Sequence, residues 1–303
     1  MIEFPERMDY RALRAFVSVV KEDGFSAAAK GLFTTQSTLS KAVKRLEEEL
    51  GLPLLERIGR RIKLTTAGEI VYDRATAMLL DRDSLLTELN DLRGLKTGVL
   101  RLGFSLGSSL LLASQFAGYR RRYPGIDVRV SVHGNRRLQE LLLAGEVDLA
   151  MMLLPLPRAF EWEDVYTEPL VVLMSKDHPL ANERKVKLKS LADSPFVMLE
   201  EDSAINRAVL DACKRRGVTP RIEAHSRQID FVVELVALGL GVAFLPRMLM
   251  ERRHHPSIRY AILDEPRTEW HIALAWRRAA YLSAAAREWL ALAREKRAAE
   301  YAQ

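Results

Sequence analysis

The sequence predicts a chain of mixed class, α plus α/β, with a helical N-terminal part and a larger C-terminal part of strands and helices. Three observations predict it. The first 65 residues contain short amphipathic helices and one basic hairpin, and a helical segment without proline follows at 66–92. From about residue 99, short apolar runs alternate with amphipathic segments, which is typical of a parallel sheet with helical crossovers.

The first two helices follow from apolar spacing and from glycine. Apolar residues at helical spacing over 13–20 predict a helix that Gly24 ends. Ser26 is a suitable N-cap for a short alanine-rich helix that stops at Gly31.

A third helix combines a buried stripe with a polar start. Thr34 or Thr35 caps it, apolar residues recur over 39–50, and Gly51 closes it. Two short helices joined by a tight turn, the second polar at its exposed start, describe a helix-turn-helix. In the major groove, short polar side chains reach base edges and lysines neutralise phosphates. We therefore expect DNA contacts from Ser26, Thr35, Gln36, Ser37, Thr38, Ser40, Lys41 and Lys44.

A basic hairpin over 55–65 follows the third helix. Gly59 offers the turn, and Arg57, Arg60 and Arg61 are the expected DNA contacts. Residues 26–65 carry eight Lys or Arg against four acidic residues, which favours an anionic partner. This hairpin is interpreted as a wing that reaches the minor groove or phosphates. The alternative is plain three-helix packing with solvated charges at the turn.

The order of these motifs resembles the winged helix-turn-helix of LysR-type transcriptional regulators. The residues that carry the resemblance are 13–16, 24–29, 35–41, 46–51, 55–57 and 64–68, and the match is dense up to about residue 68. Ser37, Lys41 and Leu55 depart from residues common in the family, which leaves the operator sequence open and not the DNA binding. The resemblance implies a DNA-binding domain over 1–65, a linker and dimerisation helix over 66–93, and an effector-binding domain over 94–303.

The linker segment reads as one long helix. At 1.5 Å per residue it is on the order of 40 Å long. Its apolar residues make a narrow seam between charged positions, a pattern of helix pairing between subunits: Val71, Ala75, Met78, Leu85, Leu89 and Leu92. The alternative is a helix that lies on the C-terminal domain. The family's linker helix pairs in a dimer, so we expect a homodimer or homotetramer.

The C-terminal part alternates strands and helices and divides naturally into two small α/β lobes. The pattern predicts strands at 99–104, 126–133, 147–153, 170–174, 196–199, 222–225, 242–245 and 271–276, and helices at 108–123, 136–144, 204–216, 229–238 and 283–299. The resemblance implies an arrangement similar to periplasmic binding proteins. Lobe I would then span about 94–165 and 268–303, and lobe II about 166–267.

Polar residues at strand ends predict a ligand site. Open α/β sheets bind ligands beyond the carboxyl ends of their strands, where helix N-termini present free N–H groups. The family's cleft residues carry over to Ser105, Ser108, Asn135, Ser203 and Phe244. Hydroxyls at helix starts favour a carboxylate, whereas three acidic residues at 200–202 argue against a highly charged ligand. We therefore expect a small organic acid as the effector. The alternative is that the three serines only cap helices.

Several function classes find no support in the sequence. It has no phosphate-binding loop, no third glycine after Gly239 and Gly241, and no nucleophile elbow, so no catalytic residue, cofactor or enzyme activity is expected. Adjacent His254 and His255 point apart and predict no metal site. Cys213 is the single cysteine; basic residues at 214–216 are expected to lower its pKa, although without a second cysteine a structural role is favoured.

The expected function is a sequence-specific, ligand-responsive transcriptional regulator. Its expected partners are double-stranded DNA with a dyad-symmetric operator, a small-molecule effector, and RNA polymerase as a further candidate. No signal peptide or membrane span is apparent, so a cytoplasmic protein without membrane contact is expected. Two other classes stay open: an enzyme acting on a small acid, and an architectural DNA protein without sequence preference.

Overall fold

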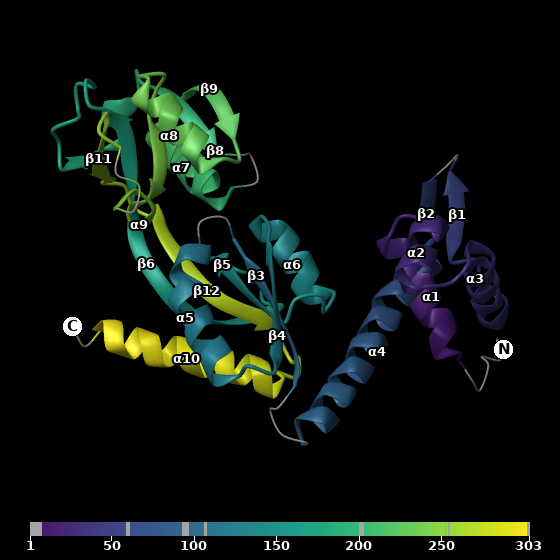
Figure 1. Cartoon of the computed structure of the whole chain (residues 1–303). Coiled ribbons are helices and arrows are strands. Elements are labelled where there is room, and N and C mark those ends of the chain that lie inside the picture. The colour runs from purple at the N-terminus through teal and green to yellow at the C-terminus, as the bar shows by residue number, and fades with distance from the viewer. Residues whose placement is uncertain are drawn as a thin grey trace. The chain divides into compact units, whose positions relative to one another are not determined.

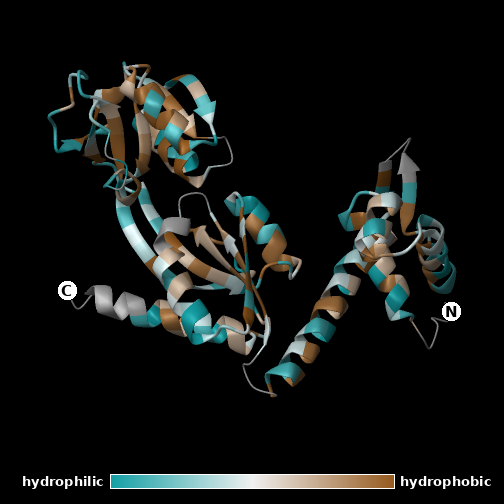
Figure 2. Cartoon of the chain, viewed as in Figure 1, coloured by the Kyte–Doolittle hydropathy of each residue, from teal (hydrophilic) through white to brown (hydrophobic). Residues whose placement is uncertain are grey.

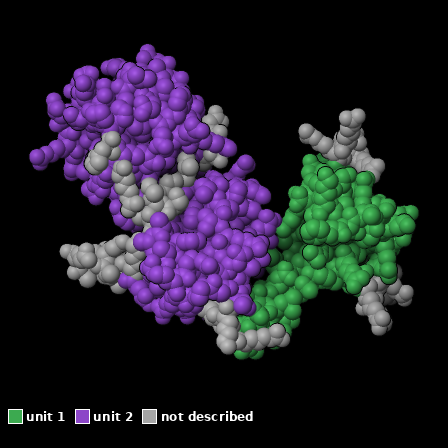
Figure 3. Space-filling model, viewed as in Figure 1, with its two compact units in different colours: residues 1–92 green, residues 93–303 purple. Residues whose placement is uncertain are grey.

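The computed structural model describes residues 8–58, 61–92, 97–105, 108–199, 203–251, 253 and 255–301, with the backbone alone at 57, 58, 61, 109–111 and 296–301. The chain divides into two compact units, residues 1–92 and 93–303 (Figure 3). Among the described residues, no helix is long and apolar enough to cross a membrane.

The N-terminal unit is a winged helix-turn-helix followed by a long helix (Figure 1). Its elements are α1 (Tyr10–Lys21), α2 (Phe25–Gly31), α3 (Gln36–Leu50), β1 (Leu55–Ile58), β2 (Arg61–Leu64) and α4 (Thr66–Asp91). Phe16, Leu39, Leu46 and Leu54 are fully buried at its centre. The apolar stripes predicted for the first and third helices therefore meet in one core.

The helix boundaries follow from local capping. The side chain of Thr35 accepts a hydrogen bond from the Thr38 N–H, and Gly51 ends α3 in the left-handed region at φ 68°. The expectation that Ser26 caps α2 is wrong. Gly24 occupies the N-cap position, because the helix begins one residue earlier, at Phe25, and Ser26 lies inside its first turn.

The helix α4 serves two roles along its length. In its first half, Val71, Tyr72, Ala75 and Leu79 pack into the core of the N-terminal unit. Toward its end and at its C-cap, five apolar side chains are exposed: Met78, Leu85, Leu86, Leu89 and Leu92. Figure 2 shows hydrophobic and hydrophilic residues alternating along this helix. The single seam expected over the whole helix is therefore wrong for Val71 and Ala75, which bind their own domain.

The C-terminal unit is an α/β structure with two lobes that share long strands (Figure 1). Its elements are β3 (Gly98–Phe104), α5 (Ser109–Arg122), β4 (Ile126–Val132), α6 (Asn135–Leu143), β5 (Leu149–Leu153), β6 (Phe160–Ser175), β7 (Lys185–Val186), η1 (Leu188–Leu191), β8 (Pro195–Leu199), α7 (Ala204–Arg216), β9 (Arg221–Ser226), α8 (Ile229–Ala237), β10 (Ala243–Pro246), α9 (Arg247–Glu251), β11 (Ile258–Leu263), β12 (Glu269–Arg277) and α10 (Ala284–Tyr301).

The first lobe contains the strands β4-β3-β5-β12 and the first half of β6, in that order. Strand β3 is parallel to β4 and β5, whereas β12 is antiparallel to β5 and β6. The second lobe contains the second half of β6 with β10, β11 and β7, and the parallel pair β8–β9, which a bridge from Phe196 to Val242 adjoins.

Strand β6 is the connection between the lobes. It pairs with β12 up to Pro169 and with β10 from Leu170 onward. The predicted strand at 170–174 covers only its buried second half. The first half was not predicted because acidic residues interrupt its apolar pattern, and the alternating residues of β11 were missed for a similar reason.

Candidate functional site

The expected DNA-contacting side chains lie together at the start of α3. All eight expected residues on α2, α3 and the intervening turn are exposed. The Ser26 hydroxyl donates to Gln36 Oε1 over 3.1 Å, which ties the first turn of α2 to that of α3. The Thr35 hydroxyl lies 2.9 Å from the Ser37 hydroxyl and 2.8 Å from the Thr38 hydroxyl. The structure therefore brings Ser26 and the start of α3 into one polar surface.

Basic residues continue this surface along α3. Lys41 and Lys44 are exposed one and two turns further on. Lys44 Nζ lies 3.6 Å from the Glu48 carboxylate, a pair so exposed that it costs little to exchange for a phosphate. In the wing, Arg57 opposes Ile62 and Arg61 opposes Ile58 in the β1–β2 hairpin. Their side chains, and all of Arg60, lie outside the described residues.

Glu47 positions the wing, and sequence reasoning missed it. Its Oε1 accepts hydrogen bonds from the N–H groups of Leu54, over 2.8 Å, and Leu55, over 3.1 Å. This carboxylate thus fixes the beginning of β1 against α3. A glutamate in an acidic run carries no sequence signal that separates it from its solvated neighbours.

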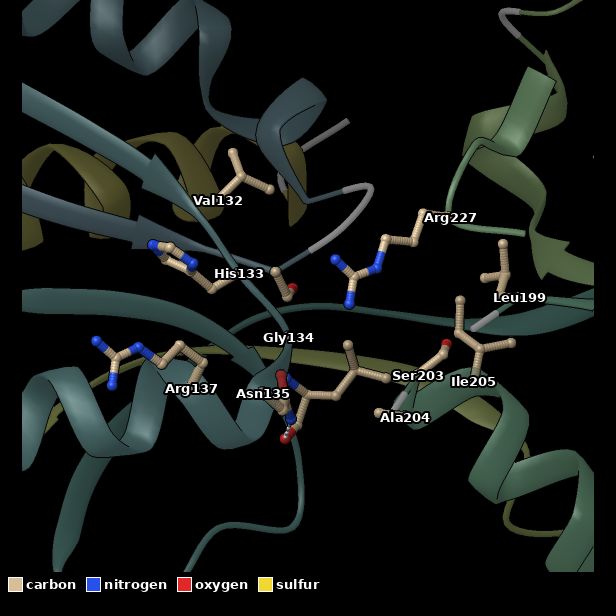
Figure 4. Close-up of a pocket in the computed structure, with 12 residues that line it drawn as sticks. Val132, His133, Gly134, Asn135, Arg137, Leu199, Ser203, Ala204, Ile205 and Arg227 are labelled. Carbon is tan, nitrogen blue, oxygen red and sulfur yellow. Dashed lines mark hydrogen bonds between the residues drawn. The ribbon is translucent and has the colours of Figure 1, made fainter. Parts of the chain in front are cut away.

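A pocket of about 370 Å³ lies between the two lobes of the C-terminal unit (Figure 4). Its walls come from the carboxyl ends of β3, β4, β5 and β8 and from the first turns of α6 and α7. This is the position that a doubly wound sheet offers to a ligand, because helix N-termini converge there. The described lining residues are Ser105, Val132, His133, Gly134, Asn135, Arg137, Leu153, Leu199, Ser203, Ala204, Ile205 and Arg227.

Three of the five expected ligand residues line this pocket: Ser105, Asn135 and Ser203. Ser108 is fully buried, and its hydroxyl donates to the Ser105 carbonyl over 2.8 Å. Phe244 is buried too, with its ring centroid 4.9 Å from that of Phe196. Neither residue is part of the lining, because Ser108 turns back onto its own loop and Phe244 faces the core of the second lobe. We therefore assign both to packing.

Two asparagines hold the helix N-termini at the pocket. Asn135 Nδ2 donates to the Leu153 carbonyl over 2.9 Å, and the Leu153 N–H donates to Asn135 Oδ1 over 3.2 Å. Asn206 binds both backbone groups of Leu199 in the same way, over 2.6 and 3.1 Å. In each lobe, the first turn of a helix is therefore fixed to the last residue of a strand.

The Ser105 hydroxyl is the least satisfied group of the pocket. Ser105 is 4% exposed, and its Oγ has no hydrogen-bond partner in the described part of the chain. A buried hydroxyl without a partner costs free energy on the order of 1–3 kcal/mol. Such a group is a candidate for hydrogen bonding to a ligand.

Basic side chains at the pocket were not predicted. The Arg227 guanidinium points into the pocket from the loop after β9, whereas His133 and Arg137 point away from Ser203 (Figure 4). Arg137 lies 3.0 Å from Glu140 on the exposed side of α6. Arg227 follows a strand end, so the rule that identified Ser105 also identifies it. The acidic run 200–202 beside the pocket lies outside the described residues.

Across the described ranges, no group of three or more His, Cys, Asp or Glu is placed to hold a metal ion. The groups that line the pocket are hydrogen-bond donors, cations and apolar side chains. Hydrogen-bond donors and cations are the groups that suit an anionic ligand.

The fold and these two sites define a class, a DNA-binding protein with a separate ligand-binding α/β domain. Residues 10–69 match the model of the bacterial regulatory helix-turn-helix proteins of the lysR family, and residues 93–298 match the LysR substrate binding domain. The chain belongs to the LysR family of bacterial transcriptional regulators.

Relatives and solved structures agree with this family. The uncharacterized HTH-type transcriptional regulator YwbI of Bacillus subtilis is 32% identical over 286 residues, 93% of this chain and 95% of that protein. A probable hydrogen peroxide-inducible genes activator of Mycobacterium leprae is 34% identical over 238 residues, 78% of this chain and 76% of that protein. A full-length OxyR variant from Pseudomonas aeruginosa, 24% identical, shares the fold with a TM-score of 0.71 over 96% of this chain and 95% of its own.

Proposed function

We propose that this regulator binds a dyad-symmetric operator as a homodimer or homotetramer, and that a small organic acid bound between its lobes controls the binding. The observation that carries the DNA half of the proposal is the exposed polar surface that Ser26 and Gln36 join at the start of α3. Short polar groups on a helix N-terminus read base edges, and Lys41 and Lys44 add phosphate contacts.

The oligomer half of the proposal rests on α4. Four apolar side chains at helical spacing, Leu85, Leu86, Leu89 and Leu92, are each about half exposed or more. A second copy of the same helix would cover them, as in paired helices of opposite subunits. In sedimentation velocity, the double variant Leu85→Asp/Leu89→Asp should run as a monomer, because two charges interrupt the apolar seam. The control Asn90→Asp adds a charge beside the seam and should keep the oligomer of the wild type.

The effector half of the proposal rests on the chemistry of the pocket. The first N–H groups of α6 and α7 lack intrahelical partners, and their partial positive charge favours a carboxylate. Arg227 brings a guanidinium to the wall of the pocket, and the Ser105 hydroxyl offers a buried donor. Binding between lobes that β6 and β12 connect would draw them together and so alter the spacing of paired DNA-binding domains.

Peroxide sensing by a cysteine is not part of this proposal. Cys213 is the single cysteine of the chain and is 1% exposed. A reactive thiol requires exposure and a lowered pKa, and burial raises the pKa of this thiol instead.

The test of DNA recognition begins with genome-wide immunoprecipitation of the bound protein. The strongest fragment and a scrambled duplex are then titrated by fluorescence anisotropy over a range of salt. A preference of roughly 10³-fold or more is expected for the genomic fragment. Equal affinity for both duplexes would show backbone contact alone and support an architectural protein.

Two variants assign the contacts. Gln36→Ala should lower the affinity for the genomic fragment about 5- to 150-fold, because a base contact is worth about 1–3 kcal/mol. Lys41→Gln should weaken both duplexes and reduce the salt slope by about one. Lys189→Gln removes an exposed lysine from the other unit and serves as the matched control. Unchanged affinity for Gln36→Ala would contradict the assigned surface.

A further inference from the structure

We infer that Glu168 is a positioning residue for the two lobes: from the strand that joins them, its buried carboxyl group holds the first turn of α9 and so sets the angle between the lobes in the ligand-free protein. This inference rests on the proposed function only in treating the space between the lobes as the ligand site. It goes further because it assigns the lobe angle to one side chain.

The lobes can pivot within the ladder of β6 and β12, which runs between them (Figure 1). This ladder ends at the pair Glu269–Pro169, and from Leu170 onward β6 pairs with β10 instead. Pro169 has no N–H to donate to a ladder, and the register shifts between Ile272 and Ala273. Both features weaken strand pairing, so the pivot lies at about 165–169 of β6.

Glu168 lies in this pivot and contacts the second lobe. Its Oε1 accepts a hydrogen bond from the Met248 N–H over 3.0 Å. Met248 is in the first turn of α9, where N–H groups lack intrahelical partners, so the carboxyl group supplies an acceptor from outside the helix. Helix α9 follows β10 directly, and its Leu249 and Met250 are buried. The hydrogen bond therefore joins the pivot to the body of the second lobe.

The other carboxyl oxygen of Glu168 is held from the side of the first lobe. Its Oε2 accepts a hydrogen bond from the Tyr166 hydroxyl over 3.1 Å and lies 3.7 Å from Arg247 Nε. Tyr166 pairs with Ile272 of β12, inside the sheet of the first lobe. The first lobe thus orients the Glu168 side chain while that side chain binds the second lobe.

Burial makes this contact sensitive to the lobe angle. Glu168 is 3% exposed, so a carboxyl oxygen that loses its partner is shielded from water. A displacement of α9 by about 1 Å takes the Met248 N–H beyond hydrogen-bond range. Other angles therefore carry the cost of a buried acceptor without a donor, and the observed angle is favoured.

The second connection between the lobes, the loop from β11 to β12, is fixed to the second lobe. Arg216 of α7 binds the Glu265 carboxylate in this loop over 2.8 Å, and Arg215 donates to the Pro266 carbonyl over 2.9 Å. The loop therefore moves with α7, and bending between the lobes is left to the ladder of β6 and β12.

The experiment measures the distance between the lobes in the ligand-free full chain. Spin labels are attached at Glu140→Cys on α6 and Asp211→Cys on α7, both of which are exposed, whereas Cys213 is 1% exposed and stays unlabelled. The labelled chain is assembled with an excess of unlabelled chain, so that double electron–electron resonance reports the distance within one subunit.

Three variants test the contact. Glu168→Leu removes both hydrogen bonds and should raise the population outside the wild-type distance peak about tenfold, the factor that one buried hydrogen bond contributes to such an equilibrium. Tyr166→Phe should produce a smaller change of the same kind, because Glu168 keeps the Met248 N–H. Glu168→Gln offers an acceptor to Met248 and an amide donor to the Tyr166 oxygen, so it should retain the wild-type distribution.

Tyr123→Phe is the matched control. It also removes a tyrosine–glutamate hydrogen bond, to Glu288 over 2.5 Å, but this one lies within the first lobe, from the end of α5 to α10. It should leave the distance distribution unchanged even where it lowers the urea midpoint.

A wild-type distribution in Glu168→Leu overturns the inference, and so does one in Tyr166→Phe if the leucine variant does not fold. A change in Glu168→Gln as large as that in Glu168→Leu overturns it too, because the bridge would then not be the cause. Since no ligand is present in these measurements, neither outcome contradicts the proposed effector.

Discussion

The side-chain amide of Asn135 hydrogen-bonds to both backbone groups of Leu153, over 2.9 and 3.2 Å. Asn135 opens α6, and Leu153 ends β5, so this pair joins a helix start to a strand end at the wall of the pocket. The residue expected to contact a ligand is therefore occupied with the backbone. Its side chain positions the first turn of α6, which lines the pocket.

Asn135→Ala should destabilise the C-terminal unit by about 1–3 kcal/mol, since it leaves the Leu153 N–H and carbonyl without their partner. It should also weaken ligand binding, because α6 loses its fixed start. All four tryptophans lie in the C-terminal unit, so urea unfolding followed by tryptophan fluorescence reports on this unit alone. Gln139→Ala, one turn further along α6, is the control. An unchanged unfolding midpoint for Asn135→Ala would refute the positioning role.

Gly68→Ala should destabilise the N-terminal unit by more than about 2 kcal/mol. A Cβ at Gly68 would lie 2.0 Å from the Leu54 carbonyl oxygen, so α4 would have to move off the start of the wing. Circular dichroism should show an early loss of helix and anisotropy a loss of DNA affinity, while the tryptophan transition stays in place. Gly31→Ala, where a Cβ meets nothing within 4 Å, should retain both stability and affinity. Equal stability of the two variants would contradict the packing argument.

Much of the N-terminal unit follows from sequence because its signals are local. Apolar spacing, the two candidate caps Thr34 and Thr35, and Gly51 place the start of α3 to within one residue and its end at Leu50, and the polar start of that helix is visible in the sequence alone. The misplaced cap at Ser26 shows the limit of such signals, since Gly24 admits the backbone that begins the helix earlier. The exposed residues in the first turns of α2 and α3 could therefore be predicted from the sequence.

The ligand pocket could be predicted in part only. Ser105, Asn135 and Ser203 follow from the rule that strand ends face the crevice. The rule cannot say which way a side chain turns, so it included the buried Phe244. It also cannot show that Asn135 is engaged by Leu153, because that contact joins residues 18 apart across two elements. The passage of the chain from the first lobe to the second within β6 depends on the pairing of β6 with β12, which lies about a hundred residues later in the sequence.

Glu168 should make the C-terminal unit less stable as the pH rises above the ordinary titration range of a glutamate. Burial raises the pKa of this carboxyl, against hydrogen bonds from the Met248 N–H over 3.0 Å and the Tyr166 hydroxyl over 3.1 Å. Between the unfolded pKa and the raised folded pKa, the folded state holds a proton that the unfolded state has lost. The stability contributed by this group is therefore present at lower pH and lost as pH rises through that window.

The measurement is the urea midpoint of the wild type and of Glu168→Gln from pH 4 to pH 8, by tryptophan fluorescence. Glu168→Gln should gain stability relative to the wild type as the pH increases, because its amide never ionises. Glu140→Gln, on exposed α6, is the control. If the urea midpoints of the wild type and of Glu168→Gln changed with pH in parallel, the Glu168 carboxyl would be excluded as the source of the pH-dependent loss of stability.

Cys213 should be unreactive in the folded protein. The expectation that neighbouring basic residues lower its pKa is wrong: burial, with Glu265 nearby, raises the pKa of the thiol to about 11. Arg216 binds the Glu265 carboxylate over 2.8 Å, and Arg215 donates to the Pro266 carbonyl, so both guanidiniums are engaged elsewhere. At pH 8 about one thiol in a thousand is ionised.

Labelling with a chromogenic disulfide should therefore be slow in buffer and fast in urea. Hydrogen peroxide should change the DNA affinity of the wild type and of Cys213→Ala equally. A peroxide response that disappears in Cys213→Ala would overturn this prediction and bring peroxide sensing back into consideration.

The strand order of the first lobe has a consequence for synthesis on the ribosome. Strand β12 is the last strand of the chain, yet it lies between β5 and β6. Until residues 269–277 emerge, β5 has β3 on one side and an open edge on the other, although its residues are buried in the finished protein. The strands of the second lobe, from the second half of β6 to β11, are complete earlier.

We therefore expect the second lobe to fold first on the nascent chain and the first lobe to close last. The apolar edge of β5 then stays uncovered while more than a hundred further residues are synthesised. During this interval, chaperones or a second nascent chain can bind to it. A chain truncated before β12 would keep that edge permanently, and its fate would be aggregation rather than partial function.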